Sequence, residues 1–107
     1  MESIEQIFQT ISDYQKLEFS HCIKVILNAK NITVRDLYEK LIDDNYYITI
    51  GTVYRYFNSS SKSNRFPPQE FMEQFVRITN LNHQQAEILF QYYFDCKLLK
   101  KYSFPHS

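Results

Sequence analysis

Two pairs of neighbouring residues carry side chains that serve catalysis in many enzymes. His21 precedes Cys22, as a base might precede a thiol nucleophile, and Asp43 precedes Asp44, as in a carboxylate pair. Neighbours on a helix do not face each other, so the first pair cannot form a dyad. Adjacent carboxylates in a turn are typical of a helix end, and the single glycine, Gly51, excludes a glycine-rich nucleotide loop. The sequence predicts no enzyme.

The cysteines and histidines lack the spacing of a metal site. Cys22 and Cys96 form no C-x-x-C pair, and His21, His83 and His106 are scattered along the chain. Because a zinc site needs several such ligands at short spacing, we expect neither a metal nor another cofactor. Both cysteines lie in apolar helical contexts, which indicates reduced thiols in a core.

The charge of the chain is balanced overall and uneven along its length. There are 12 Lys or Arg and 12 Asp or Glu, for a formal net charge of zero. Residues 1–20 have a net charge of −3, residues 21–66 have seven basic against four acidic side chains, a net of +3, and residues 67–107 balance. DNA-binding domains are usually basic, so only the middle third suits a phosphate backbone. Its modest excess predicts weak, salt-sensitive non-specific binding.

Length and composition describe one globular domain. The 107 residues are 44% hydrophobic and 22% charged, which is ordinary for such a domain. No apolar run reaches membrane-spanning length, and the N-terminus is acidic rather than that of a signal peptide. We therefore expect a cytoplasmic location.

Hydrophobic spacing predicts an all-α fold, a single domain over residues 1–107. Ser3 with Gln6, Ser12 with Gln15, and Asn82 with Gln85 fit capping boxes at three helix starts. A proline pair suits the first turn of a further helix, and a Ser-rich stretch predicts a mobile loop at about 59–66. Helices are expected at about 3–11, 13–30, 33–42, 49–57, 67–78 and 82–101. The alternative for the first two segments is one kinked helix.

Residues 33–58 have the pattern of a helix, a turn and a short second helix. Thr33 and Thr49 are good N-cap residues for the two helices, because their hydroxyls accept from orphan amides. Val53 and either Tyr56 or Phe57 are expected to face the core.

Three segments resemble the lambda-repressor-like (XRE) family in order and spacing. TVRDLYEKL at 33–41 resembles the first helix of its helix-turn-helix, and ITIGTVYRYFN at 48–58 resembles its recognition helix. PPQEFMEQFVRITNLNHQQAEILFQYY at 67–93 resembles the two helices that follow. The resemblance covers about residues 20–95. It implies a compact five- to six-helix lambda-repressor-like domain with an extra N-terminal helix, and sequence-specific binding of double-stranded DNA.

One segment departs from the family pattern. The turn between the two helices is commonly three or four residues in the family, whereas DDNYY at 43–47 looks like an insertion. It could bulge outward or swing the recognition helix from its usual pose, and Asp43 and Asp44 would repel phosphate if they faced DNA. Tyr46 and Tyr47 are expected to pack on the core, with DNA or partner contact as alternatives.

The resemblance implies that the start of the second helix enters the major groove. The implied base contacts are Thr49, Ile50, Thr52 and Arg55. Thr can contact several bases, Ile can contact a thymine methyl, and Arg can pair with guanine. The alternative makes Thr49 a simple cap and Thr52 a solvated residue.

Phosphate contacts are expected at the edges of the unit. The residues are Arg35, Asn58, Lys62 and Arg65. The first lies near the start of its helix, where the family touches the backbone, and the others follow the recognition helix. For Lys62 and Arg65 the alternative is a solubilising mobile loop. Gly51 is expected to serve helix packing rather than direct contact.

A homodimer is expected, because one recognition helix reads few bases. The last helix carries aromatic residues on more than one side, and its Ile88, Tyr92 and Phe94 are the predicted dimer interface. The alternative is that these side chains enlarge one monomer core.

Two functions remain open. The first is a small transcriptional repressor that binds DNA, with no small-molecule ligand evident. The second is a protein-interaction module that keeps the helix-turn-helix, for example a phage- or plasmid-type antagonist or an antitoxin-like partner. Zero net charge, the acidic insertion and the surplus of aromatic residues favour it. Positive charge gathered on one face with Thr49 and Thr52 favours DNA, and acidic side chains interrupting that face favour protein.

Overall fold

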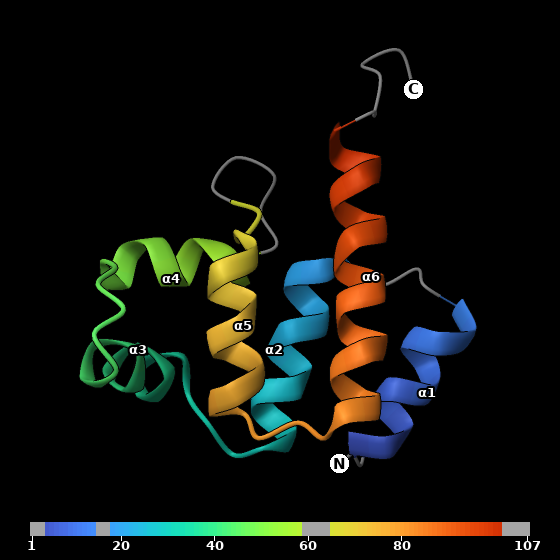
Figure 1. Ribbon diagram of the computed structural model, residues 1–107, viewed down its shortest axis with the longest axis horizontal. Helices are drawn as coiled ribbons and strands as arrows, with labels where there is room; N and C mark the ends of the chain where they lie inside the picture. Colours follow the sequence, from blue (N-terminus) through green and yellow to red (C-terminus); the bar gives the residue numbers. More distant parts are fainter. Residues whose placement is uncertain (1–3, 15–17, 59–64, 102–107) are drawn as a thin grey trace.

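The computed structural model describes residues 4–14, 18–58 and 65–101, and all of its regular structure in these ranges is α-helical (Figure 1). The expected all-α fold is therefore confirmed. The helices are α1 (Ile4–Tyr14), α2 (Phe19–Ala29), α3 (Val34–Asp43), α4 (Ile50–Phe57), α5 (Gln69–Ile78) and α6 (His83–Lys101).

Helix α2 lies at the centre of the fold. It contacts α1, α4 and α6, while α3 contacts α4 and α5, and α1 contacts α6. Figure 1 shows the consequence: α3 and α4 form one flank, and α6 and α1 form the other. The helix-turn-helix candidate is thus held at one end of the molecule by α2 and α5.

The core draws large apolar side chains from every helix. They include Ile23 and Ile26 of α2, Leu37 of α3 and Val53 of α4, all fully buried. Rings fill the space around α6, where the stacked rings of Phe66 and Tyr93 have centroids 5.1 Å apart. Tyr93 also donates its hydroxyl to the Pro67 carbonyl at 2.8 Å, which satisfies a buried polar group.

Three helices end on the same motif, with asparagine in the left-handed region. Asn31, Asn45 and Asn80 have φ of 59°, 64° and 55° and follow α2, α3 and α5. In each motif the next residue donates its N–H back into the helix: Ile32 to Leu27 O at 3.0 Å, Tyr46 to Leu41 O at 2.9 Å and Leu81 to Val76 O at 3.2 Å. This is the Schellman motif, in which asparagine here takes the place of the usual glycine. It explains how three of the described helices end without glycine, in a chain that has a single one.

Most predicted N-caps are present. The hydroxyl of Thr33 accepts from Asp36 N–H at 3.0 Å in a capping box, and Thr49 accepts from Thr52 N–H at 3.2 Å. Asn82 Oδ1 accepts from Gln85 N–H at 2.8 Å, and Gln85 Oε1 accepts in return from the Asn82 N–H. These caps were predictable because their side-chain and backbone partners are local.

Several predicted boundaries are wrong. Helix α1 continues to Tyr14, so Ser12 lies inside a helix and is not an N-cap, and the second helix begins at Phe19 rather than at residue 13. Helix α5 begins at Gln69 with Pro68 as its N-cap. The Ser3 cap lies outside the described residues.

The expected mobile loop at 59–66 lies outside the described residues except for its last two. Arg65 donates its N–H to the Arg55 carbonyl at 3.1 Å. Phe66 is half-buried, with its ring 5.4 Å from that of Phe19. Residues 65 and 66 are therefore part of the packed fold.

The interface of α2 and α6 holds buried ionisable groups. Cys22 is fully buried, and both cysteines are free thiols, as expected. Burial raises the pKa of the Cys22 thiol and of the Tyr92 hydroxyl. Tyr92 is 2% exposed, and its hydroxyl lies beside Cys96 with no conventional hydrogen-bond partner in the described part of the chain.

Tyr92→Phe is expected to raise the free energy of unfolding by about 1 kcal/mol, because it removes a buried hydroxyl whose neighbour is only the Cys96 thiol, a weak hydrogen-bonding group. Urea denaturation at neutral pH measures this. The pKa values of Tyr92 and Cys22 are higher in the folded than in the unfolded protein. The free energy of unfolding is therefore expected to be constant at neutral pH and to fall as the pH rises above about 9, where these groups lose their protons in the unfolded chain. The variant should lose stability less steeply there. A destabilised Tyr92→Phe protein would contradict the prediction.

Candidate nucleic-acid interface

Helix α4 presents one face to solvent. Gly51, Tyr54, Arg55 and Asn58 are exposed and recur at helical spacing. Thr49 is exposed just before the helix, whereas Ile50 and Thr52 are half-buried. The four predicted base-contact residues therefore lie at the start of α4 and along its outer side.

Aromatic side chains on the inner face of α4 fix its position. Val53, Tyr56 and Phe57 are all buried, so both aromatic candidates face the core. The Tyr56 ring meets that of Phe71 on α5 edge-on at 4.6 Å, and the Phe57 ring lies 6.3 Å from that of Phe75. Helix α4 is thus clamped to α5, which leaves its outer face as a rigid surface.

The two threonines at the start of α4 form a compact polar pair. Their hydroxyl oxygens are 2.8 Å apart, and Thr49 also accepts from the Thr52 N–H. One hydroxyl proton is shared in the Thr49–Thr52 contact, which leaves the other available to a ligand. The two threonines thus cap α4 and also place hydroxyl groups at its start.

Gly51 has no packing role in the fold. A Cβ built at this position meets no atom within 4 Å, and φ is not positive. The expectation that Gly51 serves helix packing is therefore wrong. An exposed helical glycine is less stable than alanine by roughly 1 kcal/mol, and here no internal contact requires it.

Helix α4 lies in a segment of the sequence that contains basic residues and no acidic ones. No Asp or Glu occurs from residue 45 to residue 69, a stretch that contains Arg55, Lys62 and Arg65. Arg55 is exposed and makes no ion pair within the described residues. Arg65 is exposed, and its backbone bond to Arg55 places it beside the end of α4. Lys62 lies outside the described residues.

The remaining predicted phosphate contacts are exposed at the helix ends. Arg35 lies in the first turn of α3, with its Nε 3.6 Å from a Glu39 carboxylate oxygen. Asn58 is the C-cap of α4, and its N–H donates to the Arg55 carbonyl at 3.4 Å. The Arg35–Glu39 pair is solvent-exposed and weak, so the guanidinium can exchange partners.

The acidic turn is tied to α5. Six residues, 44–49, separate α3 from α4. Asp44 accepts a hydrogen bond from Arg77 at 2.7 Å, and Arg77 also donates to Gln74. Asp43 is exposed. The ion pair with Arg77 therefore offsets the negative charge of Asp44, one of the two carboxylates next to the candidate interface.

The two tyrosines of that turn differ in environment. Tyr46 is half-buried against the core, as predicted, whereas Tyr47 is 77% exposed and donates its hydroxyl to Asn45 Oδ1 at 3.0 Å. The expectation that Tyr47 packs on the core is wrong, because the Asn45 turn directs the chain outward after Tyr46.

The predicted dimer residues do not share a face. Tyr92 is in the core against Phe19, with ring centroids 6.0 Å apart, and Ile88 is half-buried where α6 meets α1. Phe94 is 44% exposed. A dimer interface that includes Tyr92 is therefore wrong for this fold.

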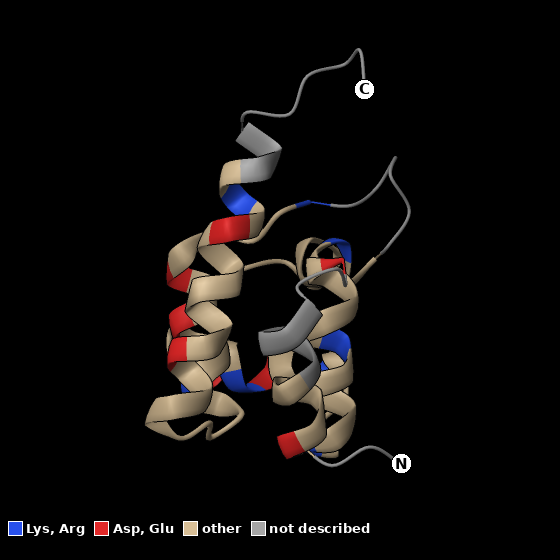
Figure 2. Cartoon of the chain, turned by 90° about the vertical axis from the view of Figure 1, so that its right-hand side faces the viewer, with Lys and Arg blue, Asp and Glu red and all other residues tan. Residues whose placement is uncertain are grey.

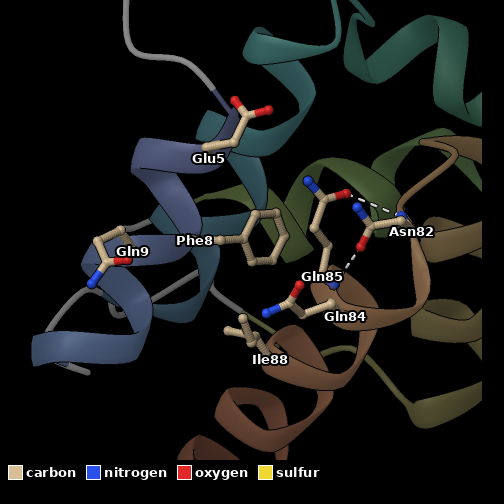
Figure 3. Close-up of a pocket in the computed structure, with 7 residues that line it drawn as sticks. All are labelled: Glu5, Phe8, Gln9, Asn82, Gln84, Gln85 and Ile88. Carbon is tan, nitrogen blue, oxygen red and sulfur yellow. Dashed lines mark hydrogen bonds between the residues drawn. The ribbon is translucent and has the colours of Figure 1, made fainter.

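A pocket of about 290 Å³ opens between α1 and the start of α6 (Figure 3). Phe8 points into it, and the reciprocal bonds of Asn82 and Gln85 form part of its rim. It lies on the flank opposite α4 (Figure 1). Its wall carries one carboxylate, Glu5, and no arrangement of acid and base.

No cluster of three or more His, Cys, Asp or Glu that could hold a metal occurs among the described residues. None of the described helices is both long and apolar enough to cross a membrane. Comparison of the chain with protein families, curated proteins and solved structures finds no match.

Proposed function

We propose that this protein binds double-stranded DNA by inserting α4 into the major groove, as a small cytoplasmic repressor of the lambda-repressor-like (XRE) type. The observation that carries the proposal is the outer face of α4. It combines exposed Arg55, a threonine pair and bare backbone at Gly51 within an acid-free segment of the chain. Arg and Thr are side chains that read base edges, and a helix fits the major groove.

The edges of this face supply phosphate contacts. Arg65 and Asn58 lie at the end of α4, and Arg35 lies in the first turn of the neighbouring helix α3. Phosphate contacts from these residues would help to fix the register of α4 on a duplex. With so few cations, affinity must depend on base contacts as well as charge.

Arg55→Ala is expected to weaken binding to the preferred duplex by about 1–3 kcal/mol and to reduce preference among sequences. Fluorescence anisotropy with a pool of short duplexes, at roughly 50 and 200 mM salt, tests this, because binding through phosphates falls steeply with salt. Lys24→Ala on α2 is the control, since it removes the same charge from an exposed position outside the face. Arg65→Ala should instead lower affinity uniformly and reduce the salt slope by about 1.

A second candidate is a protein-interaction module. The observation that favours it is the exposure of two tyrosines near the same face, Tyr47 at 77% and Tyr54 at 49%. Tyrosine is enriched at protein interfaces. A folded protein that binds no duplex at the lower salt would contradict DNA binding and favour this second function.

A further inference from the structure

The pocket between α1 and the start of α6 has an apolar wall and a polar rim (Figure 3). The Phe8 ring points into it from α1, and Ile88 lines it from α6. Its volume of about 290 Å³ is close to the lower limit for small-molecule sites, which is about 300 Å³. The pocket therefore has room for a small ligand with one apolar group.

The α6 side of the rim offers two hydrogen-bond donors, the amide nitrogens of Asn82 and Gln85. The oxygen of each side-chain amide accepts from the backbone N–H of the other residue, so these capping bonds fix which end of each amide remains. Neither amide nitrogen has an acceptor in the described part of the chain. In Figure 3 the nitrogen of Gln85 points toward α1. These donors, at the start of a helix whose dipole favours an anion, suit a carboxylate.

Glu5 supplies the opposite preference from the α1 side. Its side chain is exposed at the pocket and makes no ion pair within the described residues. Figure 2 looks onto this flank and shows an acidic residue at the start of α1. Neither residues 4–14 nor residues 82–96, which lie on the two sides of the pocket, contain Lys or Arg. A cationic group of a ligand would therefore be stabilised beside the Glu5 carboxylate.

The polar groups and the apolar wall are separated within the pocket. In Figure 3 the Glu5 carboxylate and the Gln85 amide lie on one side of the Phe8 ring, and Ile88 lies on the other. A ligand that is only a cation would leave the amide donors unpaired, and a ligand that is only an anion would be repelled by Glu5. An α-amino acid satisfies both, since one carbon atom carries its ammonium, its carboxylate and its side chain.

We propose that this pocket binds a free α-amino acid with an apolar side chain. The ammonium donates to the Glu5 carboxylate, and the carboxylate accepts from the amide nitrogens of Asn82 and Gln85. The side chain packs along Phe8 toward Ile88. An apolar wall with a few polar groups that fix orientation is the usual composition of a small-molecule site. The pocket lies on the flank opposite α4, and the inference does not rest on DNA binding.

Titration of isotope-labelled protein with L-phenylalanine or L-leucine to about 30 mM, followed by NMR chemical shifts, tests the proposal over the millimolar range of affinity. The shifts should saturate and be largest at Phe8, Gln85 and Ile88. Phenylpropionate, which lacks the ammonium, and phenethylamine, which lacks the carboxylate, should each bind about tenfold more weakly than L-phenylalanine, because one charge-assisted hydrogen bond is missing. No saturable shift with either amino acid, or shifts confined to residues outside the pocket, would overturn the proposal.

Glu5→Gln tests the position of the ammonium. It should weaken the binding of L-phenylalanine about tenfold and leave that of phenylpropionate unchanged, because only the amino acid places a cation beside residue 5. Glu70→Gln on α5 is the matched control, since it removes the same charge from an exposed first-turn position outside the pocket, and it should bind both compounds like wild type. Circular dichroism checks that each variant is folded. Unchanged affinity of Glu5→Gln for L-phenylalanine, or equal losses for both compounds, would overturn the proposed contact.

Discussion

Phe71→Ala is expected to lower the free energy of unfolding by about 3–5 kcal/mol. Phe71 is fully buried, and its ring contacts those of Tyr56 on α4 and Phe75 on its own helix, at 4.6 and 6.5 Å between centroids. Truncation leaves a cavity where α4 is clamped to α5. Domains of this size are stable by only about 5–15 kcal/mol, so the change removes a large part of the total. Urea denaturation followed by circular dichroism measures it.

Tyr47→Ala is the matched control for this substitution. It also truncates an aromatic side chain, but one that is 77% exposed, and it should change stability by no more than about 0.5 kcal/mol. The α4 contacts of Phe71 add a second expectation: the variant should show faster amide exchange in α4 than in α1, because the clamp on α4 is lost. Equal stability losses for the two variants would contradict the described core.

The side-chain caps at the beginnings of three helices were recognised in the sequence, whereas the asparagine motifs at helix ends were not, although most of the ends themselves were predicted to within one residue. Thr33, Thr49 and Asn82 cap helices through bonds to residues within three positions, so the pattern is readable in sequence. The ends use Asn31 and Asn45 in the left-handed region. Asparagine adopts that conformation less readily than glycine, and it is common in other turns, so it gives a weaker signal.

The same motif accounts for part of the segment interpreted as an insertion. Asn45 ends α3, and Tyr46 returns its N–H to Leu41, so the first half of the turn is a helix cap with a packed side chain. What remains, from Tyr47 to Thr49, is close to an ordinary short connection. Sequence spacing alone counts residues and does not distinguish a cap from a bulge.

Helical periodicity could not choose the inner side of α6. Tyr92 and Phe94 are both aromatic and two residues apart, so they point to different sides, and only packing against Phe19 of α2 decides which is buried. For α4 the periodicity is clear, and the expected inward residues Val53, Tyr56 and Phe57 are buried. The candidate interface was therefore predictable as a surface, whereas the absence of any packing against Gly51 needed the coordinates.

Gly51→Leu is expected to weaken DNA binding by about tenfold or more without loss of stability, which is comparable to a mismatched base pair in a site. No atom lies within 4 Å of a Cβ at this position, so the fold accepts the side chain. The DNA surface does not, if the backbone at the start of α4 approaches the groove closely. Anisotropy with the preferred duplex, beside thermal denaturation of the same samples, measures both effects.

Gly51→Ala separates the two consequences of losing glycine. It should stabilise the protein by about 0.5–1 kcal/mol, because alanine is the better helix former, while its single methyl group obstructs the groove least. We expect the affinity for DNA to fall stepwise from glycine to alanine to leucine, while the stability of the protein rises or stays constant. This result would show that an external partner requires the bare backbone at position 51. Unchanged affinity in the leucine variant would contradict insertion of this face of α4, because a side chain of that size could not be accommodated between helix and bases.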